Sequence, residues 1–177
     1  MSIARSVALL RGVNVGARNR ISMTDLAGWL GDAGFTEVRT YIQSGNVVLE
    51  HPANQDVGAI VHHVIAERAQ LDVAVVVRSS LDLRRIVARN PYRGAEPTQL
   101  HVSFLDAAPD PATLLRASQR DWSPEEFSVD DREVYLHLPH GMGNSVMVPR
   151  LAMLKRATTR NWNTVEALCE MAADPLA

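Results

Sequence analysis

The amino-acid sequence predicts an α+β protein in which a ferredoxin-like subdomain over residues 1–90 packs with a second, smaller α+β subdomain over 91–177 that ends in two helices. The first 78 residues show β-branched runs and amphipathic stretches in the order β-α-β-β-α-β, which is the order of the ferredoxin-like unit. The irregular run NPYRGAEP at 90–97 then interrupts regular structure and marks the boundary. With 46% hydrophobic and 21% charged residues, the composition is that of a globular protein.

Each element of the first half follows from a local pattern. Ser22 with Asp25 resembles a capping box, and apolar residues then recur at helical spacing until Gly34 supplies a C-cap. An apolar stripe from 57 to 65 predicts a second helix. The Ser-Gly-Asn turn at 44–46 joins two strands of a hairpin. The four strands are expected at 6–11, 38–43, 47–50 and 73–78.

The second half repeats part of this order without repeating its residues. Ser79 or Ser80 caps a further helix before the irregular run, and regular structure resumes after it. That further helix lies around 83–87. The elements expected after the irregular run are a strand at 100–105, a helix at 111–118, strands at 127–129 and 134–138, a helix after 145, and a helix from 163 or 164 to about 173.

Charge and hydropathy exclude several classes of protein. The chain has 18 basic and 20 acidic side chains and a net charge of −2, which argues against a protein that coats nucleic acid. No apolar run approaches the roughly 20 residues that span a bilayer. The single cysteine, Cys169, cannot form an internal disulfide or a thiolate zinc cage. We therefore expect a cytoplasmic protein without a structural metal.

The first candidate site is the polar segment at 11–20, RGVNVGARNR, which connects a predicted strand to a predicted helix. Its free N–H groups and the guanidinium groups of Arg11, Arg18 and Arg20 could hold an anion. It lacks the glycine spacing of a dinucleotide fold and of a P-loop. The alternative, a long connection whose glycines only satisfy turn geometry, stays open.

Two further segments are too polar to be core. HGMGNS at 140–145 precedes a predicted helix, where orphan N–H groups favour negative charge, although an ordinary N-cap explains Asn144 and Ser145 equally well. TTRNWNT at 158–164 has no apolar side chain except the indole. Asn163 with Glu166 makes a capping pair there, but one cap does not require Thr159, Arg160 and Asn161 as well.

Three other groups give weak signals for chemistry. Ser44 lies in the hairpin turn and lacks the G-x-S-x-G elbow of a nucleophile, so turn geometry explains it. Lys155 is the only lysine, with no recognisable surroundings for amine catalysis. His101 and His137 both alternate with core residues of their strands, which suggests that they face the same side of one sheet. Without a carboxylate placed by a motif, they do not predict a metal site.

Four ordered motifs carry a resemblance to a known family: LLRGVNVG at 9–16, RTYIQSGNVVLE at 39–50, HLPHGMGNS at 137–145 and ATTRNWNTV at 157–165. Together they resemble the bacterial family called domain of unknown function 1697, over essentially the whole chain. The resemblance implies a compact α+β fold with a ferredoxin-like N-terminal part, and it implies no activity.

The chain departs from the family pattern in two places. Relatives tend to have a second glycine and then a lysine where this chain has Ala17 and Arg18, and Arg-Ser-Lys where it has Asn144-Ser145-Val146. Arg18 keeps a cation at the first place, whereas the second has lost its charge. A mechanism that requires lysine at either place is therefore not expected here.

The leading hypothesis is that the polar loops converge and bind a small anionic or phosphorylated ligand. Catalysis, cofactor and oligomeric state are not predicted. Nucleic-acid binding through the arginine clusters is a disfavoured alternative, because the strands lack an aromatic motif; a protein-interaction module without chemistry is another. The predicted ligand-binding residues are Arg11, Asn14, Arg18, Asn19, Ser44, Asn46, Thr159, Arg160, Asn161 and Asn163.

Overall fold

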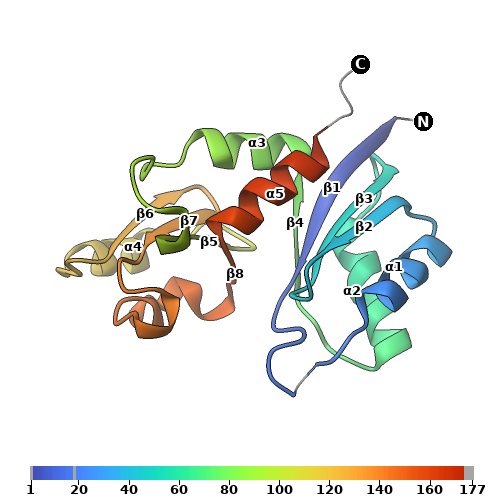
Figure 1. Cartoon of the computed structure of the whole chain (residues 1–177), viewed down its shortest axis with the longest axis horizontal. Helices are drawn as coiled ribbons and strands as arrows, with labels where there is room; N and C mark the ends of the chain where they lie inside the picture. The colour runs from blue at the N-terminus through green and yellow to red at the C-terminus, as the bar shows by residue number, and fades with distance from the viewer. Residues whose placement is uncertain (1, 18, 174–177) are drawn as a thin grey trace. The chain divides into compact units, whose positions relative to one another are not determined.

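The computed structural model describes residues 2–17 and 19–173 and shows a mixed α+β fold with two four-stranded antiparallel sheets and five α-helices in that part of the chain (Figure 1). None of the helices described is both long enough and apolar enough to cross a membrane. The chain forms two compact units. Unit 1 comprises the described residues up to 85 together with those from 167 on, and unit 2 comprises residues 86–166.

The sheet of unit 1 contains the four strands expected from the sequence. Its strand order is β2-β3-β1-β4, and all neighbouring strands are antiparallel. The two expected helices, α1 (Met23–Asp32) and α2 (Val57–Ala69), cover one face of the sheet (Figure 1). The strand bounds are β1 (Ile3–Leu10), β2 (Thr36–Tyr41), β3 (Asn46–Pro52) and β4 (Val75–Ser79).

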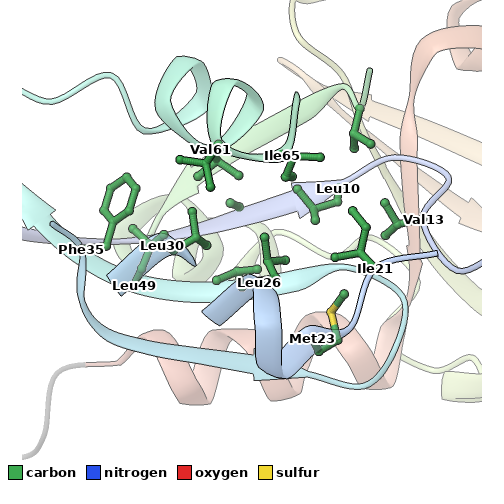
Figure 2. Close-up of a cluster of buried hydrophobic side chains, with 14 of the residues drawn as sticks. Leu10, Val13, Ile21, Met23, Leu26, Leu30, Phe35, Leu49, Val61 and Ile65 are labelled. Carbon is green, nitrogen blue, oxygen red and sulfur yellow. The ribbon is translucent and has the colours of Figure 1, made fainter. Parts of the chain in front are cut away.

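The core of unit 1 lies between the sheet and these two helices. Figure 2 shows Leu10, Val13 and Ile21 gathered at one end of this core. Their side chains are buried, with exposed fractions of 0%, 1% and 4%. Val13 and Ile21 belong to the loop between β1 and α1, so the loop itself is anchored by apolar burial. The polar residues between them are thereby held at the surface of a packed core.

Local signals for the helix ends of unit 1 are confirmed. Ser22 caps α1, because its Oγ accepts a hydrogen bond from the Asp25 N–H at 3.2 Å. Gly34 follows the helix with a φ of +95°, which glycine adopts without the cost that a Cβ would add. Ser79 accepts from the Asp82 N–H at 3.1 Å at the start of the next helix, α3 (Ser80–Ala88).

Unit 2 holds a second four-stranded sheet with the order β6-β7-β5-β8, again antiparallel throughout. Its α-helix α4 (Pro111–Ser118) begins after the cap residue Asp110. The last helix, α5 (Trp162–Ala172), begins in unit 2 and ends in unit 1. The strand bounds are β5 (Leu100–Phe104), β6 (Glu126–Asp130), β7 (Glu133–His137) and β8 (Thr158–Asn161).

Two expectations for this half are wrong. The α-helix expected after residue 145 is instead a series of short 3₁₀ turns at 142–144, 148–150 and 152–156, because Pro149 has no N–H to continue a helix. The segment expected as a polar loop at 158–164 is the strand β8 followed directly by α5. Its polar residues pair with β5, with Arg160 opposite Val102, and the tertiary pairing overrides its loop-like composition.

His101 and His137 lie on opposite faces of the unit 2 sheet, which corrects the expectation of a shared face. His101 is directly opposite Leu136, whereas His137 is opposite Leu100. Residues directly opposite each other on paired strands share a face of the sheet, and successive residues along one strand point to opposite faces. His101 therefore shares a face with Leu136, and His137, the residue after Leu136, lies on the other face. Among the residues that the structure describes, no three His, Cys, Asp or Glu side chains gather closely enough to hold a metal ion.

Candidate functional site

The predicted polar segment at 11–20 meets the hairpin turn at 44–46 in unit 1, where the loop after β1 packs against the turn before β3. The Leu10 N–H donates to the Gly45 carbonyl at 2.8 Å. Gly45 has a φ of +77°, and a Cβ built on it would lie only 2.3 Å from Val13 Cγ2. The turn therefore approaches the loop more closely than any residue with a side chain would allow.

Asn14 joins the two segments through its side-chain amide. Its Nδ2 donates to the carbonyls of Gln43 at 2.8 Å and Ile21 at 2.9 Å, and its Oδ1 accepts the Ile21 N–H at 2.9 Å. Asn19 closes the loop from the other side, since its carbonyl accepts the Asn14 N–H at 3.0 Å and its Nδ2 donates to the Gly12 carbonyl at 3.2 Å. Both asparagines thus set the shape of the loop.

The backbone of these two segments is unusual in its dihedral angles. Asn14, Asn19 and Ile42 have φ values of +55°, +48° and +50°, and Gly12 and Gly16 are also in the left-handed region. For a β-branched residue such as Ile42 this conformation is strained, yet its side chain is 52% exposed and gains little from burial. The strain is sustained by the surrounding contacts of the turn.

A surface pocket of about 350 Å³ lies where the segments meet, and we call it the unit 1 pocket. Arg20 lines it and is exposed, with no hydrogen-bond or ion-pair partner among the residues described. Ser22, the cap of α1, lines it as well, which brings the positive end of the helix dipole to the pocket. The lining residues are Asn14, Gly16, Arg20, Ile21, Ser22 and Gln43.

The start of α1 supplies further donors beside Ser22. The Asp25 N–H is taken by the Ser22 hydroxyl, whereas the N–H groups of Met23 and Thr24 have no partner within the described part of the chain. Such orphan N–H groups are characteristic of a helix N-terminus and attract anions. The exposed Asp25 carboxylate in the same turn opposes that attraction, so Arg20 is needed for a net positive site.

The other predicted residues of unit 1 lie around the pocket rather than in its lining. Asn46 is fully buried and its Nδ2 donates to the Tyr41 carbonyl at 3.0 Å and to Ser44 Oγ at 2.9 Å, which stabilises the hairpin turn. Arg11 is half-buried, and its backbone N–H donates to the Ala74 carbonyl at 3.0 Å. Arg18 lies outside the described residues.

The third predicted segment belongs to unit 2, on β8 and the first turn of α5. Thr159 Oγ1 and Ser103 Oγ are hydrogen-bonded at 2.7 Å across the sheet. Burial lowers the pKa of the Arg160 guanidinium to about 10, and this group donates to the Thr159 carbonyl at 2.9 Å. The cap of α5 is Asn161, whose Oδ1 accepts the Thr164 N–H at 2.8 Å, and not Asn163, which is exposed.

The segment at 140–145 is organised by a buried carboxylate that the sequence did not single out. Glu125 is only 4% exposed and accepts the N–H groups of Val146 at 3.2 Å and Met147 at 2.8 Å. Ser145 donates its hydroxyl to Glu125 at 3.2 Å and accepts the Val148 N–H at 2.9 Å. These bonds satisfy the chain where an α-helix was expected.

Of the six lining residues described, only Asn14 belongs to the ligand-binding set predicted from the sequence, and two of the other five, Arg20 and Gln43, show why. Arg20 was part of the first polar segment but was not assigned to the ligand, although its place just before the Ser22 cap was a usable signal. Gln43 contributes a backbone carbonyl to Asn14, a role that any residue type fills and that no sequence pattern marks.

Comparisons with known proteins give a family and a fold. A family model described as "Protein of unknown function (DUF1697)" matches residues 3–135. The solved structure of the conserved bacterial protein SP0830 from Streptococcus pneumoniae is similar with a TM-score of 0.81 and 17% sequence identity, over 97% of this chain and 100% of that chain. At this identity the likeness shows the fold alone. No curated protein matches the chain.

Proposed function

This chain belongs to the DUF1697 family of proteins of unknown function, and we propose that it binds a small phosphorylated ligand in the unit 1 pocket. The observation that carries the proposal is the meeting of Arg20 with the N-terminus of α1 at one pocket of about 350 Å³. A phosphate group requires a cation and N–H donors in one place. Arg20 lines this pocket, and Ser22 in its lining is followed directly in the chain by the N–H groups of Met23 and Thr24.

The roles of the predicted residues divide between charge and shape. Arg11, Arg18 and Arg20 supply positive charge on the loop, with Arg20 directly at the pocket. The asparagines Asn14, Asn19 and Asn46, with Ser44, hold the loop and turn in the shape that exposes the donors. Pre-organisation of this kind raises affinity because the loop does not have to be ordered when the ligand binds.

The convergence of the third segment stays a prediction. Thr159, Arg160, Asn161 and Asn163 belong to unit 2 and are not assigned to the unit 1 pocket. We also infer that unit 1 is ferredoxin-like, and its β-α-β-β-α-β element order and antiparallel strand order β2-β3-β1-β4 support this. We assign no reaction and no cofactor.

A thermal-shift screen of nucleotides and sugar phosphates at millimolar concentration tests the proposal. A ligand present at ten times its dissociation constant stabilises the folded protein by about 1.4 kcal/mol, which gives a measurable rise in Tm. Arg20→Gln is expected to abolish most of that rise. Arg84→Gln removes an exposed arginine from α3, which does not line the pocket, and serves as the matched control.

Two outcomes would count against phosphate binding. One is the absence of stabilisation by any phosphorylated compound, and the other is equal stabilisation of the wild type and Arg20→Gln. Affinity for RNA or DNA that falls steeply with added salt would instead favour the nucleic-acid alternative.

A further inference from the structure

Unit 2 contains a separate cavity of about 440 Å³ on the face of its sheet that carries His137, and we call it the Tyr92 cavity. It lies between β6, β7 and the loop that follows α3. The loop is ordered by Asn90, which is buried and whose Oδ1 accepts the Tyr92 N–H at 2.9 Å. The Ala95 N–H donates to the Tyr92 carbonyl at 3.1 Å, so Tyr92 is held from both sides.

Two rings form one wall of the Tyr92 cavity. The ring centroids of Tyr92 and His137 are 5.6 Å apart and their planes are inclined by 33°. Both residues line the cavity and both are half-buried. Aromatic faces carry negative electrostatic potential, so a wall of this kind attracts organic cations.

Carboxylates face the same cavity. Glu126 Oε2 accepts from His137 Nδ1 at 3.2 Å, which leaves Oε1 without a hydrogen-bond or ion-pair partner among the residues described. Glu96 also lines the cavity and its carboxylate has no partner in that part of the chain. The Glu126 charge and burial together raise the pKa of Tyr92 to about 12, with burial the larger cause, so its hydroxyl stays protonated at neutral pH.

The one arginine of the lining directs its guanidinium N–H groups to backbone carbonyls. Arg93 donates to the Ala88 carbonyl at the end of α3, and its Nε donates to the Asn90 carbonyl at 3.4 Å. Gln99 uses its Nε2 on the Pro139 carbonyl at 3.4 Å, so its oxygen remains as an acceptor. The groups left to a ligand are therefore mainly acceptors and aromatic faces, a set that suits a ligand rich in N–H donors.

From this arrangement we propose that the Tyr92 cavity binds an organic cation, specifically a guanidinium or alkylammonium group seated on the rings of Tyr92 and His137 and paired with the carboxylate of Glu126. The site is independent of the unit 1 pocket, since none of its residues belongs to unit 1. The same group could come from a free amine metabolite or from an arginine side chain of a peptide, and the test distinguishes these sources.

The experiment is an NMR titration of the full chain that follows the ring resonances of Tyr92 and His137. N-acetylarginine amide is expected to shift both rings saturably, and the neutral N-acetylglutamine amide is expected to leave them unchanged. Methylguanidinium is added in a parallel titration. Tighter binding of the arginine derivative than of methylguanidinium indicates a peptide source, and equal or weaker binding indicates a small free cation.

Variants measure separately the contributions of the Glu126 charge and the Tyr92 ring to binding. Glu126→Gln keeps an acceptor for His137 and removes the charge, and it is expected to weaken binding about tenfold. Tyr92→Leu is expected to weaken binding about threefold, whereas Tyr92→Phe keeps the ring and stays within about twofold of the wild type. Glu170→Gln, an exposed acid on α5 outside the cavity, is the control and is expected to leave binding unchanged.

Two results would overturn the proposal. Equal ring shifts with N-acetylglutamine amide would show that charge is not recognised, and an unchanged affinity of Glu126→Gln would remove its carboxylate from the site. Circular dichroism melting of each variant confirms that it is folded, and Tyr92→Phe with Glu126→Gln still tests the site if Tyr92→Leu fails to fold.

Discussion

The two sheets of the molecule share one strand order and differ in how the chain travels from the third strand to the fourth. In unit 1 this connection is α2, an α-helix of 13 residues that satisfies its own backbone. In unit 2 it is a run of short 3₁₀ turns between β7 and β8. The same topology is therefore compatible with a regular and with an irregular crossover.

The difference shows what an irregular crossover requires. A helix pairs its N–H groups with its own carbonyls, whereas the chain at 145–148 depends on side chains from elsewhere. Glu125 supplies that need from a position 21 residues before Val146. Buried backbone groups without hydrogen-bond partners are costly. Glu125 supplies acceptors to the irregular crossover of unit 2, as the carbonyls of α2 supply acceptors to the helical crossover of unit 1.

The largest expected effect comes from removing this carboxylate. Glu125→Ala leaves the N–H of buried Met147 and the N–H of Val146 without their acceptor and removes the partner of the Ser145 hydroxyl, and we expect a loss of about 4 kcal/mol in the free energy of unfolding. Denaturant unfolding measures the loss, and hydrogen exchange should place it at 145–148.

The matched change in unit 1 is Asp56→Ala, which removes the N-cap of α2. Its Oδ1 accepts only the exposed Ala59 N–H at 3.0 Å, and we expect a loss of about 1 kcal/mol. A loss for Glu125→Ala no larger than that for Asp56→Ala would break the comparison.

The second largest effect, somewhat smaller than that of Glu125→Ala, is expected at the contact that builds the unit 1 pocket. Gly45→Ala places a Cβ 2.3 Å from Val13 Cγ2 and 2.7 Å from Leu10 Cβ at a positive φ, and we expect a loss of about 3 kcal/mol through steric overlap and backbone strain. Chemical denaturation measures it. Gly28→Ala is the control, since a Cβ there meets nothing within 4 Å and favours α1 by up to about 1 kcal/mol.

The smallest effect concerns the charge of the two cavities. The unit 1 pocket is lined by Arg20 and no carboxylate, whereas the Tyr92 cavity holds Glu96 and Glu126. Glu126→Gln is expected to lower the pKa of Tyr92 from about 12, because the phenolate is no longer opposed by a negative charge, but to leave it above 10 because burial remains. Ultraviolet titration against Tyr92→Phe follows this one group, and an unmoved pKa would show that Glu126 does not act on the ring.

Much of the secondary structure and part of the candidate site followed from short-range patterns. The Ser22 cap, the end of α1 at Gly34 and the hairpin turn at 44–46 depend on hydrogen bonds and dihedral preferences within a few residues, which a sequence displays directly. The loop at 11–20 was marked as unusual by its glycines and asparagines, and both of those asparagines hold its shape.

Only the tertiary structure decided how these pieces meet. The bond from Asn14 to Gln43 joins residues 29 apart, and the pairing of Arg160 with Val102 places β8 where a loop was expected. Glu125 accepts N–H groups at the start of the 3₁₀ turns that lie where a helix was expected. In the first two cases the partner is a backbone group or a strand distant in the sequence, and in the third it is a carboxylate 21 residues before Val146, so no local pattern records the pairing. Sequence alone determined the regular elements of the first half and where the chain is polar, because these depend on patterns within a few residues. Long-range packing determined the structure of 145–164 and which polar groups bond to each other, because their partners are distant in the sequence.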